Sequence, residues 1–103
     1  MAIAEFTVVP IGTGSTSLSS YVAAMHRVLE AEQAKGLVRF ELTAMSTIVE
    51  GPLDEVLAVV RRVHEVPFEQ GAGRVSTSIK IDDRRDKPGV SIRQKLQSVQ
   101  EKL

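Results

Sequence analysis

The amino-acid sequence predicts an α+β fold: a four-stranded antiparallel sheet with two helices on one face, followed by an extra C-terminal helix. Two observations lead to this class. Segments in which apolar and polar residues alternate, as in half-buried strands, are interleaved with longer segments whose apolar residues recur at helical spacing. Along the chain these segments follow the order strand, helix, strand, strand, helix, strand and a last helix.

The first strand and helix are separated by a glycine-bearing turn. Residues 3–9 alternate as a strand, with Ala4, Phe6 and Val8 on its apolar face. After the turn, helical spacing continues up to Gly36, which is placed to end the helix. The apolar stripe of this helix consists of Leu18, Tyr21, Val22, Met25, Val28 and Leu29.

A hairpin is expected next. Residues 38–44 alternate again, and their apolar face carries Val38, Phe40, Leu42 and Ala44. Met45 and Ser46 are expected to turn the chain into a short strand over residues 47–50, although no Asn-Gly or Asp-Gly pair marks the turn.

The second half has the same plan. Pro52 suits the first turn of a helix whose predicted buried stripe is Leu53, Val56, Leu57, Val60 and Val63. A loop over residues 67–73 leads to a strand whose apolar face is expected to hold Val75, Thr77, Ile79 and Ile81. After a charged loop over residues 82–89, Ser91 can cap a last helix that carries Ile92, Leu96, Val99 and Leu103.

This βαββαβ order is that of the ferredoxin-like split βαβ arrangement, in which both crossover helices cover one face of the sheet. The strand directions then place the turn at residues 12–14, the hairpin at 45–47 and the loop at 71–73 at one end of the sheet. Glu50 falls at the opposite end of its strand and reaches a ligand there only if the pocket extends inward.

The stretch from Val9 to Ser17 is the best candidate for a functional site. Its two glycines permit a close approach to another group, and its hydroxyl side chains lie beside a helix N-terminus. That combination suits a small polar ligand. The alternative is that a serine or threonine simply caps the helix and the glycines turn the chain.

Length and charge limit the function classes. The 103 residues are expected to form a single domain over 1–103. Thirteen basic and thirteen acidic residues give no net charge, which argues against nucleic acid and anionic membranes as partners. The chain has no cysteine, and it carries neither a signal-peptide pattern at its start nor an apolar run of about 18 residues. We therefore expect an unprocessed cytoplasmic protein.

The search for catalytic and metal-binding motifs is negative. The glycine-rich turn lacks the Gly-Lys-Ser/Thr ending of a phosphate-binding loop. His26 and His64 are isolated on helices and are interpreted as partly exposed helix residues, so we expect no metal site. No Ser-His-Asp set can be argued from spacing, and we expect no enzyme activity.

The last helix has a narrow apolar stripe although the two-layer core is already complete without it. It either covers an end of its own sheet or contacts a partner chain, and we favour the partner chain.

Several short segments in sequence order resemble the YkoF-like thiamine-binding family. They comprise residues 9–14, 20–22, 45–51, 73–75, 80–82, 85–87 and the terminal helix over 95–103. The resemblance implies a ferredoxin-like fold, homotetramers built from dimers through sheets and terminal helices, and no cofactor beyond thiamine or a related pyrimidine as ligand. Ser46 departs from the family pattern, which has glycine at this turn.

Carried over from the family, the ligand-binding residues are expected to be Thr13, Ser15, Ser17, Met45, Thr47 and Glu50. The resemblance thus implies a non-catalytic binding protein for thiamine or its hydroxymethylpyrimidine moiety, acting as a cytoplasmic carrier or sensor. The alternative is an oligomeric structural or interaction protein without a small-molecule ligand.

Overall fold

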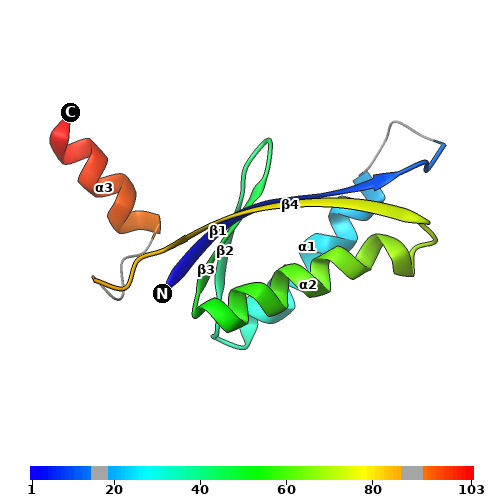
Figure 1. The fold of residues 1–103 in the computed structure, drawn as a ribbon, viewed down its shortest axis with the longest axis horizontal. Helices are drawn as coiled ribbons and strands as arrows, with labels where there is room; N and C mark the ends of the chain where they lie inside the picture. Colours follow the sequence, from blue (N-terminus) through cyan, green and yellow to red (C-terminus); the bar gives the residue numbers. More distant parts are fainter. Residues whose placement is uncertain (15–18, 87–91) are drawn as a thin grey trace.

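The computed structural model describes residues 1–14, 19–86 and 92–103. The chain forms a sheet with two long helices on one face and a third helix set apart from them (Figure 1). The elements are β1 (Ala2–Ile11), α1 (Ser19–Ala34), β2 (Arg39–Leu42), β3 (Thr47–Gly51), α2 (Leu53–Glu69), β4 (Arg74–Asp83) and α3 (Ile92–Lys102).

The sheet is antiparallel throughout, with strand order β2-β3-β1-β4. β1 and β3 are the inner strands, and both crossover helices lie on the same face, as the split βαβ arrangement requires (Figure 1). The predicted α+β, ferredoxin-like fold is therefore confirmed. Within the described residues, no helix is long and apolar enough to cross a membrane.

The core lies between the sheet and these two helices. Ala4 and Phe6 of β1 face the helices, as the alternating pattern predicts, and Val49 of β3 pairs with Ala4 on the same face. From α2, the buried valines are Val56, Val59, Val60, Val63 and Val66. Small and β-branched residues let the helices pack closely against the sheet. Because this core is closely packed, truncating one of its side chains would leave a cavity and lower the stability of the protein.

The structure corrects two predictions about α2. Leu57 was predicted in the buried stripe but is 43% exposed, because Val56 and Val60 already define the buried face and Leu57 is rotated about 100° away from Val56. The predicted loop at residue 67 is also wrong, since the helix continues to Glu69 with Pro67 buried in its last turn. Proline is tolerated so near the end because few further helical bonds depend on it.

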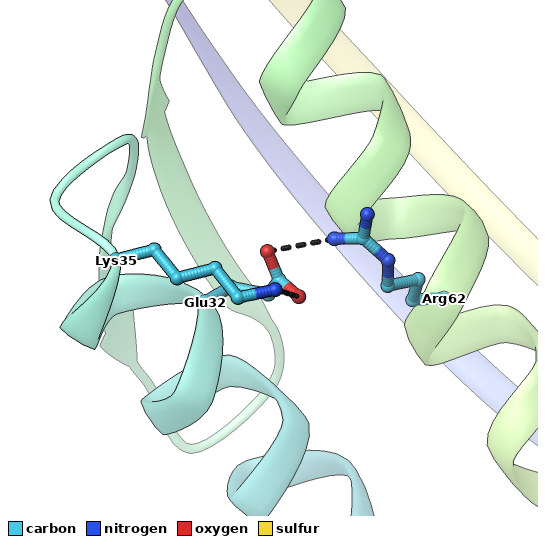
Figure 2. A network of polar contacts seen from close by, with 3 residues as sticks. All are labelled: Glu32, Lys35 and Arg62. Atoms are coloured by element: carbon cyan, nitrogen blue, oxygen red, sulfur yellow. Dashed lines mark hydrogen bonds and ion pairs between the residues drawn. The ribbon is translucent and has the colours of Figure 1, made fainter.

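A buried carboxylate links the two crossover helices (Figure 2). Glu32 of α1 has a side chain only 8% exposed, and its Oε2 lies 2.6 Å from Nη1 of Arg62 on α2. Its Oε1 lies 3.2 Å from Nζ of Lys35 on the next turn. Two cations thus compensate a charge that would otherwise be costly to bury, and one of them, Arg62, joins α1 to α2.

The other face of the sheet is not covered by α1 or α2. Register places Ile3, Glu5, Ile48 and Lys80 on this open face. α3 lies on this side, away from the two long helices (Figure 1), and a shallow hollow is lined by Glu41, Leu96, Gln97 and Gln100. Leu96, Val99 and Leu103 are exposed, whereas Ser91 lies outside the described residues.

Candidate functional site

A cleft opens where β1 and β3 differ in length. β3 pairs with β1 only as far as Thr47, which lies opposite Phe6, whereas β4 accompanies β1 to Ile11. From Thr7 to Ile11, β1 is therefore paired with β4 but not with β3. The space between this part of β1, α1 and the tip of the β2–β3 hairpin is a cleft of about 360 Å³, within the size range of small-molecule sites.

The cleft has an apolar floor and a rim that carries hydroxyl groups. Its floor includes Phe6, Leu29 and Val63, which are at most 3% exposed. Further lining residues come from β1, α1 and the hairpin, and they are Thr7, Val8, Val9, Val22, Met25, His26, Leu42, Thr43, Ala44, Met45, Ser46 and Thr47. A flat, mostly apolar molecule with a few polar groups fits such a surface.

The hairpin tip is organised by one hydroxyl group. Oγ1 of Thr43 accepts a hydrogen bond from the backbone N–H of Ser46 at 3.0 Å and lies 3.3 Å from the N–H of Met45. The same hydroxyl lies 2.9 Å from the carbonyl oxygen of Ser46, to which it donates. These bonds close a four-residue turn between Leu42 and Thr47, and they present Met45 at the rim, 85% exposed.

His26 is the titratable side chain that lines the cleft. Its ring meets Phe40 edge to face at 5.4 Å between centroids, and its Nε2 contacts the carboxylate Oε1 of Glu30 one turn later. Nδ1 is buried and has no hydrogen-bond partner among the residues that the structure describes. A buried nitrogen that makes no hydrogen bond lowers the stability of the folded protein, because it loses its hydrogen bonds to water without replacement.

The predicted site residues divide into separate groups. The two predicted site residues of the hairpin, Met45 and Thr47, both line the cleft. Thr13 does not, because Ile11 already lies about 16 Å along the strand from the Phe6–Thr47 pair. The glycine turn and the hairpin thus lie at the same end of the sheet without sharing this cleft.

Glu50 is on the opposite face from the cleft. It pairs with Ile3, whereas Thr47 pairs with Phe6 on the helix-covered face. Residues three apart on a strand point to opposite faces, so Glu50 cannot be a deeper carboxylate of the same cleft without a change of register. Ser15 and Ser17 lie outside the described residues.

Sequence reasoning missed the contribution of α1 to the cleft. Val22, Met25 and Leu29 were assigned to a buried stripe, and His26 was interpreted as a partly exposed helix residue. A signal was present, because Val22 and His26 are four residues apart and so lie on one face of the helix. What the sequence did not indicate is that part of this face meets a cleft.

The lining of the cleft combines hydrogen-bonding groups with apolar side chains. It offers hydroxyl groups, one imidazole and exposed backbone groups around apolar walls. Among the described residues, no group of three or more His, Asp or Glu side chains is placed to hold a metal ion. The arrangement can orient a polar heterocycle by hydrogen bonds.

Comparisons with known proteins cover nearly the whole chain. The family model described as thiamine-binding protein matches residues 4–100. The UPF0045 protein YqgV of Bacillus subtilis is 47% identical over 103 residues, which span 100% of this chain and 98% of that protein. A UPF0045 protein of Methanothermobacter thermautotrophicus is 47% identical over 104 residues, with 100% of both chains covered.

Solved structures show the same fold. The crystal structure of the hypothetical protein MJ1052 from Methanocaldococcus jannaschii matches with a TM-score of 0.80 and 34% identity. The match covers 97% of this chain and 96% of that chain.

Proposed function

This chain belongs to the thiamine-binding protein family, and from that premise we propose that it binds thiamine or the hydroxymethylpyrimidine moiety of thiamine. The observation that carries the proposal is the cleft between α1, β1 and the β2–β3 hairpin, with its apolar floor and hydroxyl-bearing rim. Its volume of about 360 Å³ suits a single small heterocyclic molecule.

The chemistry of a pyrimidine matches the lining. The ring has two flat apolar faces, which Phe6, Met25 and Met45 can contact. Its ring nitrogens and exocyclic amine need directed hydrogen bonds, for which the side chains of Thr47, Ser46 and His26 are placed around the rim. Met45, exposed and unbranched, can fold over a bound ring.

Glu30 favours a cationic ligand. Its carboxylate is 61% exposed and holds Nε2 of His26, a side chain of the cleft. A thiazolium ring that extends from the cleft toward this carboxylate would experience an attraction, although solvent and salt would screen it.

We propose further that the protein is a non-catalytic carrier or sensor in the cytoplasm, without a cofactor of its own. Residues 1–103 would act as one domain, and copies would associate into a homotetramer built from dimers. The open face of the sheet and the exposed stripe of α3 support self-association, because both leave apolar side chains in water.

Calorimetric titration with thiamine and with hydroxymethylpyrimidine tests the ligand. We expect Thr47→Val to weaken binding about threefold to tenfold, the effect of one lost hydrogen bond, without lowering the melting temperature of the free protein much. Thr13→Val is the matched control, because Thr13 does not line the cleft, and it should bind as the unaltered protein does.

Two outcomes would count against the proposal. Absence of heat and of any thermal shift with both compounds at about 1 mM would exclude useful affinity for either of them. Loss of binding in Thr13→Val, with Thr47→Val unaffected, would move the site to the glycine turn. If neither compound binds while the protein still self-associates, the interpretation as an oligomeric interaction protein prevails.

A further inference from the structure

Past the β2–β3 hairpin, one side of β1 has no neighbouring strand. β1 pairs with β3 only from Ala2 to Phe6, whereas its pairing with β4 continues without a break to Ile11. The two long strands thus run on together past the hairpin (Figure 1). Within the part of the chain that the structure describes, no strand lies on the β3 side of β1 after Phe6. The backbone N–H and C=O groups that point to this side therefore have no ladder partner.

Pro10 indicates which residues of β1 point their backbone groups to this side. In an antiparallel strand, the N–H and C=O of one residue point to one neighbouring strand, and those of the next residue point to the other. Proline has no N–H, so within a sheet its nitrogen faces away from the paired strand. Pro10 lies opposite Val75 in an unbroken register with β4, so its nitrogen faces away from β4. Two residues earlier, Val8 likewise points its N–H and C=O away from β4 and toward the hairpin.

The cleft reaches this edge of β1. Val8 lines it, and so do Thr7 and Val9, whose side chains lie on the opposite face of the sheet from that of Val8. Residues of both faces line one cleft where the cleft runs along the edge of the strand. At about 3.3–3.4 Å per residue, Val8 lies about 7 Å beyond Phe6, which is the residue opposite Thr47. A ligand in the cleft therefore takes the place that a further residue of β3 would have.

The backbone of Val8 offers one donor and one acceptor side by side. In a hydrogen-bonded antiparallel pair, each residue donates its N–H to the opposed C=O and accepts a bond from the opposed N–H. A 4-aminopyrimidine carries the same complement, because its exocyclic amine is a donor and the adjacent ring nitrogen is an acceptor. This edge of the ring can replace the opposed residue: the ring nitrogen accepts from the N–H of Val8, and the amine donates to its C=O.

The direction of β1 determines how the ring lies. The N–H of Val8 is on the side of Phe6, and its C=O is on the side of Pro10. The ring nitrogen and the substituent next to it therefore face Phe6, which is part of the apolar floor. The substituent next to the amine points along β1 toward the glycine turn. The side chains of the rim remain available for the second ring nitrogen and the hydroxyl group of the ligand.

We propose that the backbone N–H and C=O of Val8 are specificity-determining groups of the cleft and select a 4-aminopyrimidine over its 4-oxo counterpart. In the same orientation, the oxo compound sets its ring N–H against the N–H of Val8 and its oxygen against the C=O, so both contacts become repulsive. The inference rests on the proposed function and adds to it the edge of the heterocycle that is recognised and the residue that recognises it.

Hydrogen exchange followed by NMR tests the geometry. In the free protein, the amide protons of Thr7 and Val9 should exchange slowly because they bond to β4, whereas that of Val8 should exchange at least tenfold faster. Saturation with hydroxymethylpyrimidine should slow the exchange of Val8 at least tenfold more than that of Thr7 or Val9, because the ligand supplies the missing acceptor.

Calorimetry with the two pyrimidines tests the selection. The 4-oxo counterpart of hydroxymethylpyrimidine should bind at least tenfold more weakly than the 4-amino compound, because two hydrogen bonds are replaced by two repulsive contacts. Semisynthesis can replace the amide between Thr7 and Val8 by an ester, which removes the N–H of Val8 without adding bulk. This ester should weaken binding of the amino compound about threefold to tenfold and reduce the preference for it over the oxo compound.

Proline substitution provides a matched pair of variants. Val8→Pro should leave the melting temperature nearly unchanged, because this position has no ladder bond to lose, as at the native Pro10. It should abolish binding, since the proline ring removes the donor and occupies its place. Val9→Pro is the control, because it removes a bond to β4 and should lower the melting temperature markedly.

Three results would overturn the inference. Slow exchange at Val8 with fast exchange at Val9 in the free protein would reverse the assignment of backbone directions, as would a melting temperature lowered equally by both proline variants. Binding of hydroxymethylpyrimidine without slower exchange at Val8, or with equal affinity for the oxo compound, would refute this contact and leave the proposed ligand in place. If neither thiamine nor hydroxymethylpyrimidine binds, the proposed function and this inference both fail.

Discussion

Gly51 ends β3 where the chain leaves no room for a side chain. A Cβ atom there would lie 2.7 Å from the carbonyl oxygen of Leu37 and 3.1 Å from Cγ1 of Val38. Because a backbone atom cannot move as freely as the end of a side chain, we expect Gly51→Ala to lower the free energy of unfolding by about 1–3 kcal/mol. Urea denaturation measures the change.

Gly73 is the matched control for this substitution. No atom lies within 4 Å of the position that its Cβ would occupy, so Gly73→Ala should leave stability unchanged or raise it slightly. Equal losses in both variants would show that the crowding at Gly51 is not the cause.

Single residues also mark the limit of sequence reasoning about the site. The family resemblance assigned Thr47 and Glu50 to one pocket that extends inward, yet strand alternation separates their side chains onto opposite faces. Glu32 and Arg62 gave no signal, because thirty residues separate the two partners of this ion pair. Only the packing of α1 on α2 brings them together.

Among the elements, the β2–β3 hairpin has the most direct consequence for the cleft. Thr43→Val removes the hydroxyl that bonds the turn, while Thr43→Ser retains an oxygen at the same place. We expect the valine variant to lose about 0.5–1.5 kcal/mol of stability and to bind the ligand more weakly, because Met45 and Ser46 are no longer held at the rim.

Denaturation and calorimetry on both Thr43 variants check this prediction. Serine should behave much like threonine. Identical behaviour of the two variants in both measurements would mean that the hydroxyl does not organise the turn.

The helices show why element boundaries are harder to predict than element types. Helical spacing identified α2, but Pro67 suggested an end at Val66, three residues before the observed one at Glu69. Proline removes one backbone hydrogen bond of the helix, whereas burial of its apolar ring stabilises the fold, and that burial depends on tertiary contacts. Leu57 was likewise assigned to the core by spacing, although the valines beside it occupy the face toward the sheet.

At the scale of the whole molecule, α3 leaves apolar side chains in water. Leu96 and Val99 are 59% and 58% exposed. If α3 contacts a partner chain, Leu96→Ser combined with Val99→Ser should raise the dissociation constant of the assembly at least tenfold, because burial of each side chain contributes about 1.5–3 kcal/mol. Sedimentation velocity measures the effect.

Gln97→Ser on the same helix provides the control, because it changes an exposed polar residue and should leave association unchanged. A sedimentation profile unchanged by the double serine variant, together with a lower melting temperature, would instead indicate that α3 packs on its own chain.

The sequence by itself determined the fold class, the order of the elements and the face that each strand turns toward the helices. These follow from local patterns, since alternation and helical spacing are read within a few neighbouring residues, as in β1 with Ala4 and Phe6. The tertiary structure alone decided where the cleft lies and which residues line it. That outcome depends on how far β3 extends along β1 and on which face of α1 meets the gap beyond Thr47, and both are set by contacts between segments distant in sequence.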